Sequence, residues 1–99
     1  MKDYIEHLNK SFESRIRLGI MSALMVNDEI DFGTMKELLD LTDGNLASHI
    51  TALEKLNYIL VNKRFVGKKP NTTYQITEEG REAFLKHLSA LENLIKKTS

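Results

Sequence analysis

The sequence predicts a mainly helical α+β fold in which a β-hairpin separates the last helix from the helices before it. Apolar residues recur at three- and four-residue intervals in the first half of the chain and again near its C-terminus, which is helical spacing. Between residues 58 and 77 the pattern changes to β-branched and aromatic runs around a turn-rich segment. Ninety-nine residues with 41% hydrophobic content suit one core, so we expect a single domain over residues 1–99.

The first predicted helices lie in "DYIEHLNKSFESRIRLGIMSALMV". Six apolar residues there keep helical spacing: Ile5, Leu8, Phe12, Ile16, Ile20 and Ala23. The pattern predicts a short N-terminal helix that runs into, or stops just before, a first long one. Asn27 and Asp28 end the long helix, and "EIDF" after them is short enough to be only an edge strand.

Two short helices follow. Thr34 stands three residues before Glu37, which is the spacing of a capping box, so a second helix is predicted to begin near Thr34. A third helix covers "DGNLASHITALEK", with Thr42 as its N-terminal cap and Asp43 at the positive end of its dipole. At 100° per residue its few apolar side chains form one narrow seam, and its far side is small and polar.

A hairpin and a long helix complete the chain. Asn57 is a plausible left-handed terminator of the third helix. The runs "YILVNKRFV" and "TTYQIT" are predicted strands, and "GKKPN" between them is predicted to be the turn. Thr77 opens a last helix over residues 77–97. Two helices joined by a short turn, followed by a hairpin and a helix, make a winged helix-turn-helix.

Charge is distributed unevenly although the formal net charge is zero. Residues 1–41 hold five Lys/Arg against eight Asp/Glu, residues 42–75 hold five against two, and residues 76–99 hold four of each. The positive charge therefore concentrates in the third of the chain that contains the third helix and the hairpin, which is typical of a nucleic-acid-binding surface.

Several classes of site are disfavoured. The chain has no cysteine, which excludes disulfides, thiolate zinc sites and cysteine nucleophiles. His7, His49 and His87 lie on three different predicted helices without a close ligand pair, so we expect no metal and no cofactor. No catalytic arrangement or phosphate-binding glycine loop appears, so we expect no enzyme. No apolar run reaches the roughly 18 residues of a membrane span, and we expect a cytoplasmic protein.

Residues 41–82 resemble the winged-helix transcriptional regulators related to the MarR and ArsR groups. The resemblance rests on "DGNLASHI", on "LEKLNYI" leading into the wing, on "FVGKKPNTTY" across it and on "ITEEGRE" after it. It covers about residues 12 to 90. Ala47 stands where a second serine is common, which puts one phosphate contact in doubt, and Asn57 stands where glycine is common. The resemblance implies a regulator that binds double-stranded DNA.

The chemistry of the residues points to the same partner. The major groove admits one helix, and close approach requires small, polar side chains on the facing side. The predicted DNA-contacting residues of the third helix are Thr42, Gly44, Asn45, Ser48, His49, Thr51 and Lys55. Those of the wing, predicted to lie along phosphates or to reach into the minor groove, are Lys63, Arg64, Lys68 and Lys69. His49 is equally compatible with packing inside the domain.

A wide apolar stripe on the last helix indicates a homodimer. Phe84, Leu88, Leu91 and Ile95 have the four-three-four spacing of a heptad repeat. We expect them to form a dimer interface together with Ile5, Leu8 and Phe12 of the segment 1–12, where Tyr4 also lies. The alternative is that the stripe covers the helix-turn-helix within one chain.

Other interpretations remain open for the whole surface. The polar side of the third helix is also what an ordinary solvated helix presents, and lysines in a hairpin turn often only aid solubility. The zero net charge and the acidic first third favour a winged-helix module that binds a protein and not DNA. The sequence identifies no effector, operator or direction of regulation.

Overall fold

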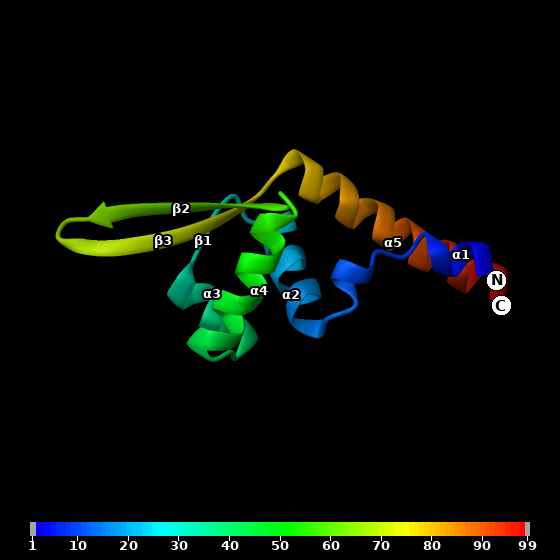
Figure 1. The fold of residues 1–99 in the computed structure, drawn as a ribbon, viewed down its shortest axis with the longest axis horizontal. Helices are drawn as coiled ribbons and strands as arrows, with labels where there is room; N and C mark the ends of the chain where they lie inside the picture. The colour runs from blue at the N-terminus through cyan, green and yellow to red at the C-terminus, as the bar shows by residue number, and fades with distance from the viewer. Residues whose placement is uncertain (1, 99) are drawn as a thin grey trace.

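The computed structural model describes residues 2–98, and Figure 1 shows a helical body from which a two-stranded wing projects. The elements are α1 (Lys2–Glu6), the 3₁₀ helix η1 (Lys10–Phe12), α2 (Arg15–Met25), β1 (Ile30–Asp31), α3 (Phe32–Leu39), α4 (Asp43–Lys55), β2 (Ile59–Val66), β3 (Lys69–Ile76) and α5 (Glu78–Thr98). This is a winged helix-turn-helix, as the sequence predicts. The edge strand predicted at "EIDF" is present as β1.

The start of α3 differs from the prediction. The helix begins at Phe32, and its cap is Asp31, whose side chain accepts a hydrogen bond from the backbone N–H of Thr34. Thr34 is therefore inside the helix, and the predicted capping box is wrong. Asp31 is the last residue of β1 and keeps an extended backbone, which is the conformation that a capping residue needs.

The helix α4 and its ends agree with the sequence pattern. The Thr42 hydroxyl accepts from the backbone N–H of Asn45 at 3.1 Å and so caps the helix. Its buried residues are Leu46, Ile50 and Leu53. The chain leaves the helix through Asn57, whose φ of 61° is the predicted left-handed conformation.

The three strands form an antiparallel sheet in the order β1-β3-β2. The hairpin is longer than predicted, since Val66 pairs with Lys69 and only Gly67 and Lys68 form the turn. Gly67 has a φ of +66°, which a glycine at the first position of a two-residue turn adopts without strain. Pro70, expected in the turn, lies in β3 opposite Phe65.

The core is built around Phe12. Its ring is fully buried and lies 5.4 Å from the Tyr58 ring, 5.3 Å from Phe84 and 5.4 Å from His87, between centroids. Phe84 is also buried. The expectation that Phe12 and Phe84 contact a second chain is therefore corrected, because the protomer itself already covers both rings.

The last helix packs closely on the start of the wing. Thr77 donates its hydroxyl hydrogen to the backbone oxygen of Asn57 at 2.6 Å and accepts from the N–H of Gly80 at 2.9 Å. A Cβ at Gly80 would lie 2.0 Å from the backbone oxygen of Tyr58, so only glycine allows this approach. Beyond that point α5 runs away from the body.

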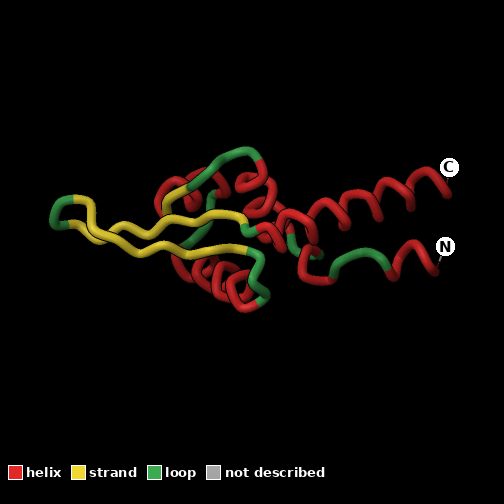
Figure 2. The backbone as a smooth tube through the Cα atoms, turned by 90° about the horizontal axis from the view of Figure 1, so that it is seen from above, coloured by secondary structure: helices red, strands yellow, loops and turns green. Residues whose placement is uncertain are grey.

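The molecule is elongated, with extents of 54 × 25 × 21 Å. In Figures 1 and 2, α1 lies beside the far part of α5, and both termini are at the end opposite the wing. The wing projects past α3 and α4 at the other end. The wing and the far part of α5 therefore occupy opposite ends of the protein, with α4 between them.

Candidate nucleic-acid interface

The outward side of α4 carries small and polar side chains that the fold leaves uncovered. Gly44, Asn45, Ser48, Thr51 and Lys55 are all exposed, while the apolar seam opposite them is buried. Close approach by a large partner is therefore sterically open along the length of the helix. Thr42 is exposed as well, but its hydroxyl already serves as the helix cap.

His49 lies at the edge of this side and is committed to a contact within the protein. Its Nδ1 atom accepts a hydrogen bond from Arg17 Nε at 3.0 Å, and the side chain is half-buried. Burial lowers the pKa of His49, and the neighbouring Arg17 charge lowers it further. A neutral imidazole is the form that accepts this hydrogen bond, so the pair links α2 to α4.

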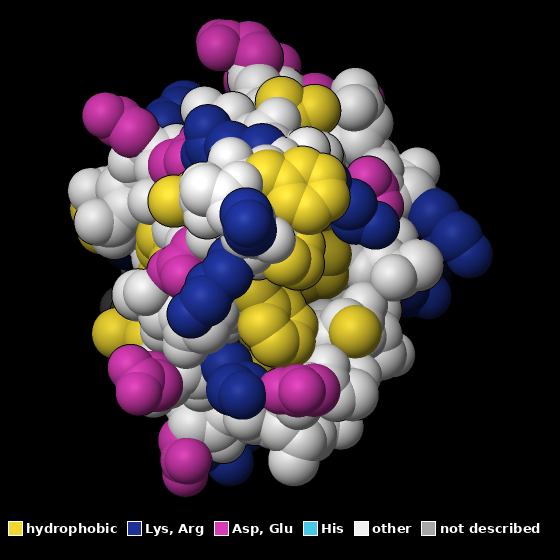
Figure 3. Space-filling model, turned by 90° about the vertical axis from the view of Figure 1, so that its left-hand side faces the viewer, with side chains coloured by type: hydrophobic (Ala, Val, Ile, Leu, Met, Phe, Trp, Pro, Cys, Tyr) yellow, Lys and Arg dark blue, Asp and Glu magenta, His cyan; other side chains and the backbone are white. Residues whose placement is uncertain are grey.

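The wing presents three exposed lysines and one arginine that is already paired. Lys63, Lys68 and Lys69 are exposed. The Arg64 guanidinium instead forms an ion pair with Glu29 and donates to the Thr73 hydroxyl at 3.1 Å. Seen from the wing end in Figure 3, Lys and Arg side chains surround a group of apolar ones.

A second ion pair joins the two helices of the helix-turn-helix. Lys36 Nζ lies 2.9 Å from Asp43 Oδ1, at the first residue of α4. Both side chains are partly exposed, so the pair contributes little to stability but orients the start of α4. Sequence reasoning missed Arg17, Lys36 and Glu29, because each acts on a residue on another element and no local spacing indicates the contact.

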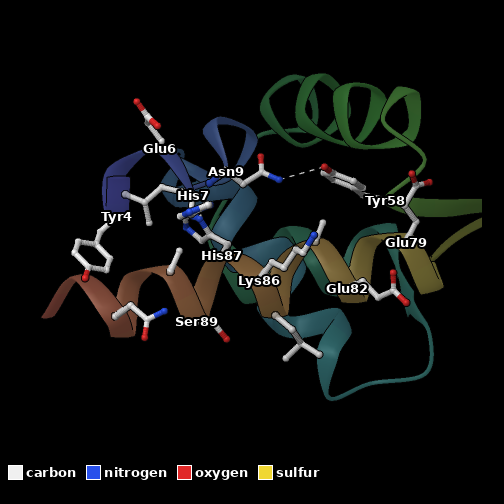
Figure 4. Close-up of a pocket in the computed structure, with 15 residues that line it drawn as sticks. Tyr4, Glu6, His7, Asn9, Tyr58, Glu79, Glu82, Lys86, His87 and Ser89 are labelled. Atoms are coloured by element: carbon white, nitrogen blue, oxygen red, sulfur yellow. Dashed lines mark hydrogen bonds between the residues drawn. The ribbon is translucent and has the colours of Figure 1, made fainter. Parts of the chain in front are cut away.

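The opposite end of the molecule has a groove between the N-terminal segment and α5, with a volume of about 1010 Å³. Asn9 organises it: its backbone N–H donates to His87 Nδ1 at 3.0 Å, and its side-chain amide donates to the Tyr58 hydroxyl at 3.1 Å, as Figure 4 shows. Tyr4 and Leu8 line the same groove. The N-terminal segment is thereby fixed against α5.

Of the predicted interface residues that remain outside the core, only Leu8 lines this groove, and the others are exposed elsewhere on α1 and α5. Leu88 and Leu91 are each 42% exposed, Ile95 is 61% exposed and Ile5 is 53% exposed. Leu8 and Tyr4 are half-buried. Leu85, which widens the predicted stripe, is exposed on the same helix.

The three histidines differ in their surroundings. His49 accepts from Arg17 and His87 from Asn9, as described, while His7 is exposed in the loop after α1. Within residues 2–98 no three histidine or acidic side chains come together as a possible metal site. The same part of the chain contains no helix that is both long and apolar enough to cross a membrane.

Comparison with known proteins identifies the family. The family model described as "Winged helix DNA-binding domain" matches residues 16–95. The uncharacterized protein MJ0432 of Methanocaldococcus jannaschii is 33% identical over 87 residues, which are 88% of this chain and 95% of that protein. Among solved structures, a transcriptional regulator homologue from Pyrococcus horikoshii is 34% identical with a TM-score of 0.79, over 95% of this chain and 98% of that one.

A more distant structure shares the fold alone. YusO of Bacillus subtilis has a TM-score of 0.80 at 14% identity, over 98% of this chain and 68% of that one. The resemblance to winged-helix regulators that the sequence indicated is confirmed by these matches. The chain belongs to the winged helix DNA-binding domain family and resembles transcriptional regulators.

Proposed function

We propose that this protein is a sequence-specific regulator of transcription that binds double-stranded DNA as a homodimer. The observation that carries the proposal is the position of the uncovered polar side of α4 and the lysines of the wing, away from the termini and from the apolar stripe. Such a molecule contacts DNA at one end and a second copy at the other. Its place is the cytoplasm, with the DNA, and it performs no catalysis.

In this proposal α4 enters the major groove. Asn45, Ser48 and Thr51 are short, exposed and polar, and they lie on the side of the helix opposite its buried seam. An amide such as that of Asn45 can bond adenine in two places, and such a contact discriminates between bases by about 1–3 kcal/mol. Lys55 adds a charge at the C-terminal end of the same helix.

The wing contributes phosphate contacts through Lys63, Lys68 and Lys69. Their ammonium groups are exposed, and charges of this kind supply affinity without reading sequence. Arg64 takes a different part from that expected from the sequence: its ion pair with Glu29 ties the outer part of β2 to the loop before β1. His49 likewise supports α4 through Arg17 and does not contact bases.

In the proposed dimer, the apolar side of α5 packs against the same side of α5 in the second copy. The participating regions are the segment 1–12 and residues 77–97. Leu88 and Leu91 are large, exposed and separated by three residues, so they form one patch. Leu85 and Ile95 are further exposed apolar residues of α5, and Ile5 is an exposed one of α1. Exposed apolar patches of this kind on a small protein mark an interaction surface.

Selection of bound duplexes from a random library tests the DNA-binding proposal. Two α4 helices in a two-fold dimer read half-sites about 34–36 Å apart, so the recovered sequence should be an inverted repeat with that spacing. Asn45→Ala and Ser48→Ala should weaken binding to this operator more than to random duplex. Failure to bind any duplex at low salt would contradict the proposal and favour a protein-binding module. Equal losses on operator and random DNA would show that α4 does not read bases.

The dimer is tested separately by light scattering. The wild-type protein should be a dimer at tens of micromolar, and Leu88→Glu combined with Leu91→Glu should give a folded monomer. Leu38→Glu is the matched control, because Leu38 is an exposed leucine on α3 and outside the stripe. A wild-type monomer would contradict the proposed dimer, and unfolding of the double variant alone would show that the stripe belongs to the protomer core.

A further inference from the structure

The tip of the wing carries an apolar group that the fold itself does not bury. Phe65 is 73% exposed and Val66 is 63% exposed, and Pro70 lies opposite Phe65 and is exposed too. Single apolar residues on a surface need no explanation. Phe65 and Pro70 lie together on one face near the end of a projecting hairpin, where they contribute no burial to folding and leave apolar area that a partner can cover.

The register of the hairpin shows which way Phe65 points. Side chains alternate between the two faces of a strand, so Phe65 shares a face with Lys63 and Val61. Val61 packs against the core, which identifies this face as the one turned towards the helices. Phe65 lies four residues further along, about 13 Å beyond Val61 at 3.3 Å per residue. Val66 points to the other face.

The charges around the tip select the chemistry of the partner. Lys63 is on the same face as Phe65, and Lys68 and Lys69 are in and beside the turn. A ring surrounded by exposed ammonium groups is complementary to a polyanion that also offers an apolar wall. Duplex DNA has both, since the sugars and stacked bases of the minor groove lie between two phosphate chains.

The reach of the wing fits the same groove. When α4 occupies the major groove, the next groove on that side of the duplex is the minor groove, half a helical turn or about 17 Å along the axis. The strands of the wing are eight residues long, which corresponds to roughly 26 Å. The length of the wing is therefore comparable with the distance between the two grooves.

We propose that Phe65, supported by Pro70 across the hairpin, is an apolar wedge that enters the minor groove beside each half-site and unstacks one base step. Phenylalanine and proline are among the side chains that minor-groove proteins insert between bases. Flexible pyrimidine–purine steps unstack most easily, so the protein should prefer operators with a TA or CA step at this position. The preference would fall at a base step that α4 does not contact. This inference rests on the proposed DNA binding.

The test uses the selected duplex with 2-aminopurine in place of single adenines flanking each half-site. Binding of the wild-type protein should raise the fluorescence at one step, because unstacking relieves quenching by the neighbouring bases. Phe65→Ala should abolish that signal and weaken affinity roughly tenfold or more, from the lost burial of the ring. The slope of affinity against salt should stay unchanged, since no charge is removed.

Two further variants make the result decisive. Val66→Ala removes an equally exposed apolar side chain from the other face and should leave fluorescence and affinity as in wild type. Phe65→Leu retains an apolar wedge and should keep part of both. If wild type binds the selected duplex but Phe65→Ala binds equally well, the wedge is refuted while the DNA-binding proposal stands. Lower affinity with unchanged fluorescence would also refute it, in favour of a contact with the sugars. Absence of binding to any duplex would overturn both proposals.

Discussion

The salt dependence of DNA binding distinguishes the wing lysines from Arg64. Replacing Lys68 and Lys69 with alanine removes two exposed charges per protomer and four per dimer. Each lost phosphate contact lowers the slope of log affinity against log salt by about 0.9, so the slope should fall by about 3.6. Between 50 and 200 mM salt, this corresponds to roughly a 150-fold smaller loss of affinity for the variant than for wild type.

The matched control removes a charge pair that the protein already neutralises. In the combined variant Glu29→Gln and Arg64→Gln, the net charge is unchanged and the ion pair between the wing and the loop before β1 is gone. We expect this variant to have the same salt slope as wild type. If Arg64 contacted a phosphate, the slope would instead fall by about 1.8 per dimer. Titrations by fluorescence anisotropy at four salt concentrations measure all three proteins. An unchanged slope for the lysine variant would refute the reasoning and show that both side chains are only solvated.

The remaining predictions concern stability and are all measured by urea unfolding. Gly80→Ala should cost about 1–3 kcal/mol, because a backbone oxygen occupies the space of the new Cβ, whereas Gly44→Ala, with nothing within 4 Å, should be neutral or slightly stabilising. Asp31→Ala should cost about 1 kcal/mol, because Asp31 caps α3, and Thr34→Ala should cost much less. A larger loss of stability for Thr34→Ala than for Asp31→Ala would show that the capping box is present after all. Because the pKa of His49 is lowered in the folded protein, the unfolded chain binds the imidazole proton more tightly. Neutral His49 therefore contributes stability above the ordinary pKa of about 6.5, and this contribution is lost as the pH falls through the lowered value. Wild type should therefore lose more stability than His49→Gln between pH 7.5 and 5, and equal losses would contradict the assignment.

Local signals made the helices and the hairpin predictable. Thr42 and Asn57 each fix a backbone conformation through their own chemistry, and the structure has both as expected. Asp31 and Thr34 were harder, since either side chain is a good cap and only the preceding strand decides between them. Pro70 was expected in the turn because proline usually breaks a sheet. It is tolerated in β3 because β1 pairs only with Thr73 and Tyr74, so β3 has β2 as its single neighbour there.

Long-range contacts limited the prediction of the site. Phe84 and Leu88 differ by only 40° around a helix, so their spacing cannot tell a core position from a neighbouring exposed one. The structure buries the first and exposes the second. Arg64 and Glu29 are 35 residues apart, and no sequence pattern links them. The charge of a wing residue is visible in the sequence, but whether that charge is available to a partner depends on the tertiary fold.

Charge pairing bears directly on how such a neutral protein achieves affinity for DNA. The acidic first third supplies Glu29 to the wing, which reduces four cations to three lysines per protomer. Three lysines give a dimer about six phosphate contacts, at the low end of the range over which salt controls binding strongly. Non-specific binding should then be weak at physiological salt, and the difference in affinity between the operator and other DNA must come from short-range contacts. The side chains in a position to make these short-range contacts are the polar ones of α4 and the apolar ones at the tip of the wing. Their contacts do not depend on the release of counterions from DNA.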